Sequence, residues 1–179
     1  MLTDFIATVA AGAGAACLII VANHLGPRFF GRRLPKWAMP ASIGLAMLGY
    51  AIWNEYTWYP RMRAALADGV VVASAPAESA MYRPWSYLFP TVARFIAVDR
   101  ANAARSPANP QIFAANAIVF QRWLPERRIP QAFDCDKAAR ADLFDGASLT
   151  ADGVLKGAEW VNAADDPLVA AACNGGQDG

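Results

Sequence analysis

Histidine is almost absent from this chain, and charged residues are scarce. One histidine occurs in 179 residues, only 17% of the residues are charged, and the net charge is +1. Soluble domains carry about 25% charged residues. A nearly neutral chain lacks the basic field that nucleic-acid binding requires. The single histidine, His24, also excludes most catalytic dyads and metal sites that are built on histidine.

Apolar residues make up 56% of the chain instead, and they are concentrated near the N-terminus. Residues 2–25 contain one acid, Asp4, and no Lys or Arg, and about 20 such residues cross a bilayer as a helix. Residues 37–53 carry no charge, and Trp or Tyr occupies positions 53, 56, 58 and 59 at the end of this stretch and just after it. These aromatic residues favour the membrane interface. We therefore predict a transmembrane helical hairpin over residues 1–59, with spans at about 3–25 and 37–58.

Each predicted span has an alternative interpretation. A cleaved signal peptide is the alternative for the first segment, although no basic stretch precedes Phe5. A buried core helix is the alternative for the second segment, because it is short for a span.

The charge distribution predicts how the hairpin is oriented. The loop 26–36 contains four bases and no acid, whereas no base precedes the first span. Short basic loops stay in the cytoplasm, so both termini are expected outside it. Arg61 and Arg63 argue mildly for the opposite orientation. Residues 1–63 carry a net charge of +4 and residues 64–179 a net charge of −3. We expect a protein of the cytoplasmic (inner) membrane with its C-terminal domain in the periplasm.

The remainder of the chain is typical of a small α+β domain that is richer in strand than in helix. We expect a short helical stalk over residues 60–69 that ends at Gly69, a domain over 70–173 and a loose tail over 174–179. The predicted elements are strands at 69–74, 92–99 and 117–123, a hairpin turn at Asp152–Gly153, and a capped helix at 166–173. The fold class is thus a membrane-anchored α+β protein with a strand-rich extracytoplasmic domain.

The outer domain contains two cysteines, Cys135 and Cys173, while Cys17 lies in the first span. In an oxidising compartment the two can form a disulfide, which would close a loop of about 38 residues. We predict this disulfide, with two buried free thiols as the alternative.

Small residues on the predicted spans suggest close helix packing. Spacing of the small-xxx-small type allows helix backbones to approach each other. It occurs at positions of both spans: Ala10, Gly14, Ala41, Gly44 and Gly49. The two spans could pack on each other through these residues, or they could dock on a larger membrane protein, and the two uses are compatible on different faces.

Two proline-bounded segments have the composition of contact surfaces. Residues 82–90 and 122–130 are rich in aromatic residues and arginine, which are enriched at binding hot spots. The candidate partner-contact residues are Tyr82, Arg83, Trp85, Tyr87, Phe89 and Trp123. Burial of the aromatic rings in the core is the alternative.

No catalytic, cofactor or metal site emerges from the sequence. The acidic run that begins at Asp134 does not follow the calcium-loop pattern, and no histidine stands in the outer domain to activate a nucleophile. His24 is expected at the membrane interface, with haem or chlorin ligation as the alternative. Candidates for carboxylate or Ser/Lys chemistry can be named without evidence that they meet: Glu78, Glu126, Glu159, Lys137, Ser148, and the pairs Ser148–Lys156 and Ser86–Lys137.

These features favour a non-catalytic accessory, assembly or stabilising subunit of a larger integral membrane protein complex. Its partners would be that complex and the lipid bilayer. The alternative is a membrane-anchored envelope enzyme that uses carboxylate or Ser/Lys chemistry in the outer domain.

Overall fold

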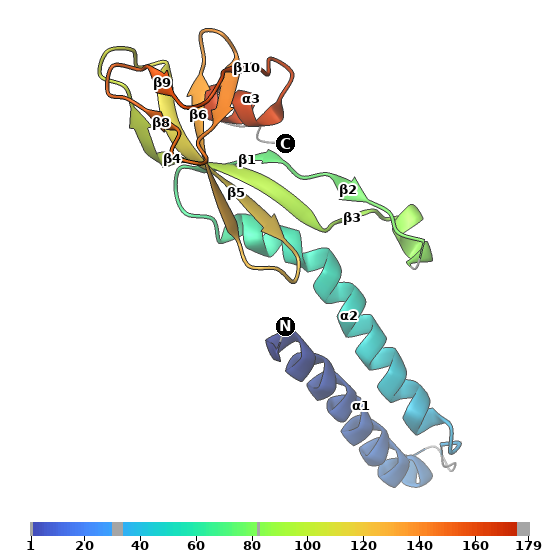
Figure 1. Cartoon of the computed structure of the whole chain (residues 1–179). Helices are drawn as coiled ribbons and strands as arrows, with labels where there is room; N and C mark the ends of the chain where they lie inside the picture. The colour runs from blue at the N-terminus through green and yellow to red at the C-terminus, as the bar shows by residue number, and fades with distance from the viewer. Residues whose placement is uncertain (1, 30–33, 82, 175–179) are drawn as a thin grey trace. The chain divides into compact units, whose positions relative to one another are not determined.

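The computed structural model describes residues 2–29, 34–81 and 83–174, with the backbone alone for 27–29. Two compact units are present, Met1–Trp58 and Tyr59–Gly179. The first unit is helical, and the second is built on an antiparallel sheet (Figure 1). The chain is therefore an α+β protein with an apolar N-terminal helix and a strand-rich domain.

The helical unit contains α1 (Leu2–Phe29) and the first part of α2 (Ala38–Ala64). The two helices meet at Gly12, the only buried residue of the described part of α1. A Cβ atom there would lie 3.0 Å from Cγ of Met47 and 3.3 Å from Cγ2 of Ile43, so a larger residue would require these side chains to shift. A polar contact adds to it: the amide nitrogen of buried Asn54 donates to Asp4 Oδ1 at 3.0 Å.

Among the described helices, only α1 is long and apolar enough to cross a bilayer, over Leu2–Gly26. Almost none of its most apolar stretch is buried in the protein. The second span expected at 37–58 does not meet the same criterion, because polar residues such as Asn54 and Glu55 interrupt the apolar stretch of α2. The two-helix transmembrane hairpin thus reduces to one candidate span and a second, more polar helix.

The domain of the second unit is a six-stranded antiparallel sheet in the order β1-β4-β5-β6-β7-β10. The bounds are β1 Val70–Ser74, β4 Arg94–Arg105, β5 Ile112–Gln121, β6 Arg127–Asp134, β7 Ala139–Asp142 and β10 Val161–Asn162. Two short hairpins accompany the sheet, β2 (Ala77–Glu78) with β3 (Thr91–Val92), and β8 (Ser148–Leu149) with β9 (Leu155–Lys156). A 3-10 helix, η1 (Pro84–Tyr87), lies between β2 and β3.

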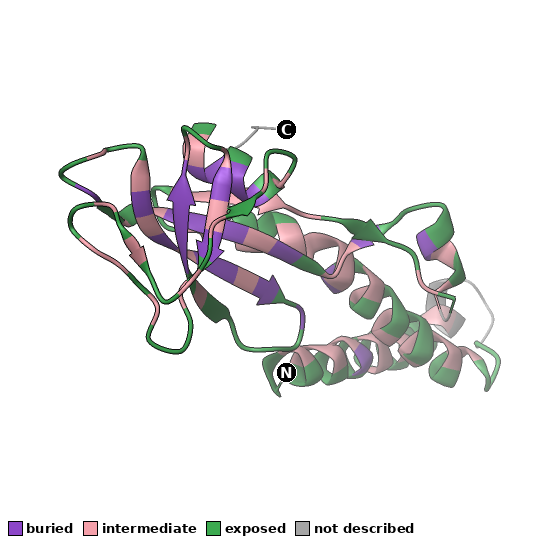
Figure 2. Cartoon of the chain, turned by 45° about the horizontal axis from the view of Figure 1, so that its top comes forward, coloured by how far each residue is buried: buried purple, intermediate pink, exposed green. Residues whose placement is uncertain are grey.

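One face of the sheet is covered by α3 (Pro167–Asn174), which packs on β1, β4 and β6. Figure 2 shows buried stretches on the strands and on α3 in purple. The core cluster consists of Val98, Phe113, Ala115, Ala117, Phe133, Leu168, Val169, Ala171 and Ala172. Asp166 caps the helix by accepting a hydrogen bond from the Leu168 amide at 2.8 Å, as the sequence predicts. Its other carboxylate oxygen lies 2.8 Å from Nε of Arg140 on β7.

A disulfide joins Cys135, which follows β6, to Cys173 on α3, with the Cα atoms 5.6 Å apart. The expected pairing of these cysteines is therefore present, and the free thiol is Cys17, exposed on α1. The bond fixes the end of α3 to the sheet.

The opposite face of the sheet carries a second apolar cluster. Phe95 and Phe120 stack with their ring centroids 4.7 Å apart, and the ring of Tyr59 meets Phe95 edge-on at 5.4 Å. Tyr59 belongs to α2, which runs through Pro60 to Ala64 where the sequence suggested a separate stalk. The last turns of α2 therefore belong to the sheet domain.

Candidate functional site

The segment between β2 and β3, which we call the aromatic loop (residues 79–90), has a buried polar side chain and exposed apolar ones, the reverse of the usual arrangement. Ser86 is buried, and its hydroxyl accepts a hydrogen bond from the Ala80 amide at 2.9 Å and donates to the Arg83 carbonyl at 2.6 Å. Around this polar centre the large apolar residues point outward, and Met81, Leu88 and Phe89 are 87%, 79% and 66% exposed. The loop is thus held by a buried serine and presents hydrophobic side chains on its outside.

The predicted contact residues are not all alike in exposure and position. Tyr87 and Phe89 are exposed on the aromatic loop, whereas Arg83 and Trp85 are half-buried and Tyr82 lies outside the described residues. Trp123 lies apart from them, in the turn after β5, with the Arg122 guanidinium 4.5 Å from its ring centroid. The sequence analysis did not name Met81, and it included Leu88 only as part of the segment 82–90. Both are more exposed than the named contact residues that the structure describes, because exposure of single apolar residues leaves no local pattern.

The small residues predicted for helix packing lie elsewhere than at the helix contact. An added Cβ would meet nothing within 4 Å at Gly14, Gly44 or Gly49. Ala10 is exposed and Ala41 is half-buried. The close approach described above is at Gly12, whereas Gly14, Gly44 and Gly49 leave open space around an added Cβ; the alternative use of these small residues, docking on a larger membrane protein, stays a prediction.

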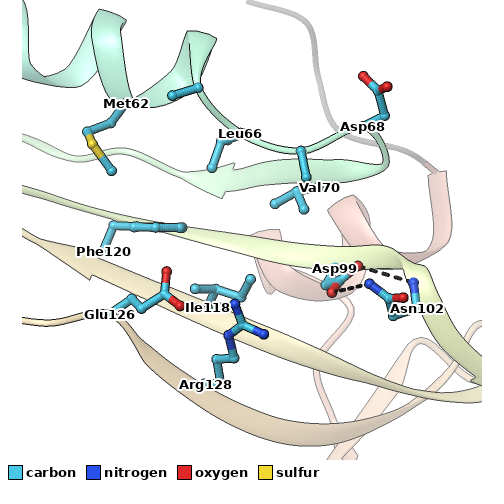
Figure 3. Close-up of a pocket in the computed structure, with 12 residues that line it drawn as sticks. Met62, Leu66, Asp68, Val70, Asp99, Asn102, Ile118, Phe120, Glu126 and Arg128 are labelled. Atoms are coloured by element: carbon cyan, nitrogen blue, oxygen red, sulfur yellow. Dashed lines mark hydrogen bonds and ion pairs between the residues drawn. The ribbon is translucent and has the colours of Figure 1, made fainter.

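A pocket of about 360 Å³ lies within the second unit, between the end of α2 and the face of the sheet that carries Phe120 (Figure 3). Met62, Leu66 and Val70 point across it toward Ile118 and Phe120 in Figure 3, and together they form an apolar wall. Its polar residues are Asp68, Asp99, Asn102, Glu126 and Arg128. Volumes of about 300–1,000 Å³ with an apolar lining and a few polar groups are typical of small-molecule sites.

A bulge in β4 shapes one end of this pocket. The register between β4 and β5 shifts between Asp99 and Ala104, so β4 carries extra residues there. The Asp99 carboxylate closes the bulge by accepting hydrogen bonds from the backbone amide of Asn102 at 3.1 Å and from its side-chain amide at 2.9 Å. Bulges are frequent beside functional sites because they redirect side chains.

The turn before β1 brings the chain close to this bulge. Gly69 has φ of +84°, and a Cβ there would lie 2.8 Å from Cβ of Ala101. The Gly69 carbonyl accepts a hydrogen bond from the Arg100 amide at 2.9 Å. Glycine is therefore required at this position, both by its backbone conformation and by the space available.

The other end of the pocket carries an ion pair. Arg128 lies 2.9 Å from Oε1 of Glu126, with both side chains about half exposed. Solvent-exposed pairs of this kind contribute little to stability. The pair gives the pocket mouth one charge of each sign.

Comparison with protein-family models, curated proteins and solved structures finds no match.

The candidates for acid–base or nucleophilic chemistry are dispersed over the domain. Of the five residues considered for an envelope enzyme, Glu126 alone lines the pocket. Glu78 pairs with Arg94 at 3.3 Å, and Lys137 lies 3.9 Å from Asp134. Glu159 lies in an exposed turn.

Ser148 and Lys156 face each other as partners in the β8–β9 hairpin, but both are exposed there. The Ser86 hydroxyl serves the aromatic loop, as described above, and not a Ser86–Lys137 pair. The structure thus does not bring these candidates together in one site among the described residues.

The acidic run after β6 has a structural explanation. Asp134 is buried, and one carboxylate oxygen accepts hydrogen bonds from the amides of Asp136 and Lys137, both at 3.1 Å. This is the geometry of an Asx turn, which reverses the chain between β6 and β7. No cluster of three or more His, Cys, Asp or Glu suited to a metal occurs in the described part of the chain.

Proposed function

We propose that this chain is a non-catalytic accessory, assembly or stabilising subunit of a larger integral membrane protein complex. The observation that carries the proposal is the aromatic loop, with Ser86 buried inside it and Met81, Leu88 and Phe89 on its outside. Folded proteins normally place such side chains inward, and exposed apolar patches mark interaction surfaces. Aromatic residues and methionine are also enriched in the cores of protein interfaces.

The described residues of the loop are suited to this role because several local contacts restrain their backbone. Pro84 restricts the start of η1, and the Ala80 backbone pairs with Arg83 across the turn. A preorganised loop loses less conformational entropy on docking than a flexible one, so more of its contact energy contributes to affinity.

The anchor in this proposal is the helical hairpin. The exposed surface of α1 is apolar over a length that suits a bilayer. The more polar α2 is proposed as the second span, with the polar group of Asn54 satisfied by Asp4. Paired polar groups are the form in which such residues are tolerated between membrane helices.

The orientation that accompanies this anchor places the hairpin loop in the cytoplasm and the sheet domain outside it. The bases of the loop support the assignment. The disulfide of the sheet domain is consistent with an oxidising compartment.

Site-specific photo-cross-linking in intact membranes tests the docking proposal. A photoreactive phenylalanine analogue at Phe89 is expected to yield one discrete adduct with an integral membrane protein. The matched control is Phe144, which is 51% exposed but lies on another loop, and it is expected to yield none. Equal adducts at both positions, lipid adducts alone, or no adduct at Phe89 would each contradict the proposal.

A further inference from the structure

The pocket beneath the end of α2 contains a buried carboxylate without a cationic partner. Asp99 is 6% exposed and lines the pocket. Its hydrogen bonds both come from Asn102, and no ion pair joins it to any residue that the structure describes. Buried charges in proteins are normally paired, because a carboxylate loses much of its hydration when it is buried. Asp99 is therefore a buried carboxylate whose two hydrogen-bond donors in the described residues both belong to the neutral side chain and backbone of Asn102.

The carboxylate also retains free acceptor positions. An ionised carboxylate offers about four lone-pair sites, and the two bonds from Asn102 occupy one on each oxygen. Two lone-pair sites therefore remain for further donors.

The rest of the lining selects for a molecule with a long apolar part. The apolar side chains of Met62, Leu66, Val70, Ile118 and Phe120 form the wall opposite and beside Asp99 (Figure 3). A ligand that covers this hydrocarbon surface gains about 25 cal/mol of binding free energy per Å² of apolar area buried.

The charges around the pocket favour a cation. The lining contains three acids, Asp68, Asp99 and Glu126, and one base, Arg128. Asp68 is exposed and turns its carboxylate away from the pocket in Figure 3, while Arg128 neutralises Glu126. Asp99 thus remains as the uncompensated charge inside.

We propose that this pocket binds a small amphipathic amine. Its protonated amino group would donate to Asp99, and its alkyl or aryl body would lie between α2 and the sheet. A charge-assisted hydrogen bond of this kind is stronger than one between neutral groups. This site is separate from the aromatic loop, and its occupancy does not depend on the proposed docking role.

Titration calorimetry on the full chain in phosphatidylcholine nanodiscs tests the proposal, with 4-phenylbutylamine as the probe and empty nanodiscs as the blank. We expect saturable binding of the amine. Binding of 4-phenylbutanol, which has the same body without the charge, is expected to be at least about tenfold weaker.

The decisive variant is Asp99→Asn, which keeps the shape of the side chain and removes its charge. It is expected to weaken amine binding at least about tenfold, whereas Asp152→Asn, the same change at an exposed turn residue, leaves binding unchanged. If Asp99→Asn does not fold, Leu66→Trp provides the second test, because the larger ring fills the pocket and should abolish binding. Absence of saturable amine binding, equal binding of the alcohol, or full binding by either pocket variant would overturn the proposal.

Discussion

Removal of the disulfide between Cys135 and Cys173 should lower the stability of the sheet domain by an amount that can be worked out from the chain. The variant is Cys135→Ser with Cys173→Ser, in a background where the exposed Cys17 is also replaced by Ser to prevent unwanted oxidation. The reference protein carries only the Cys17 change.

The expected magnitude follows from the sequence separation of 38 residues between the bonded cysteines. In the chain-entropy account, closing such a loop stabilises the folded state by about 4 kcal/mol at 25 °C. For a domain of about 120 residues, this corresponds to a fall in melting temperature of about 12–20 °C. Residual structure in the unfolded chain reduces the effect, so these values are upper estimates.

Near-ultraviolet circular dichroism of the full chain in detergent measures the transition, and mass spectrometry verifies the bond in the reference protein. At low temperature α3 should stay docked on the sheet in the variant, because four of its own side chains are buried in the core: Leu168, Val169, Ala171 and Ala172. A fall of less than about 2 °C, with the bond verified in the reference, would refute the reasoning.

Three further experiments test the packing described above. Phe133→Ala empties a fully buried position and should cost about 3–5 kcal/mol in the free energy of unfolding, measured by urea titration. Gly69→Ala and Gly146→Ala both place alanine at positive φ, which costs about 1 kcal/mol, but only the first meets a neighbouring Cβ. The Gly69 variant should therefore unfold at a lower urea concentration than the Gly146 variant. Equal midpoints would contradict the close approach of Gly69 to Ala101. Gly12→Leu should widen the separation of α1 and α2 measured between spin labels, whereas Gly14→Leu, with nothing within 4 Å, should leave it unchanged.

Local patterns predicted several elements of the sheet domain. The apolar run at 69–74 became β1, and the Asp-Pro start of the last helix became the cap and first turn of α3. The turn at Asp152–Gly153 lies between β8 and β9, with Gly153 at φ of +79°. In each case the information lies within a few adjacent residues, which is why it could be read without the fold.

The strand β6 escaped prediction because its sequence contains Pro130 and two arginines. The structure explains how a central strand accommodates the proline. The Pro130 carbonyl accepts a hydrogen bond from the Leu143 amide, which lies just beyond the end of β7. The backbone nitrogen of Pro130, which carries no hydrogen, faces the same side. The missing N–H therefore lies at the end of the β6–β7 ladder. Helix was predicted from Pro60 onward, but as a separate stalk. That it continues α2 and packs against Phe95 was not predicted, because this packing is not a local property.

The pocket had no sequence signal at all. Asp99 was read as the last residue of a strand, and only the register shift between β4 and β5 turns it into a buried carboxylate beside an apolar wall. The exposed residues of the aromatic loop were found in part, because proline-bounded aromatic composition is visible in the sequence while the burial of Ser86 is not.

The size and composition of the particle obtained after gentle detergent extraction test the central claim most directly. Native mass spectrometry of the intact chain, extracted at its natural abundance, should give an assembly that contains a second integral membrane protein in fixed ratio. The Leu88→Ser, Phe89→Ser variant should release that partner. A lone 19.2 kDa monomer under every extraction condition would contradict the account.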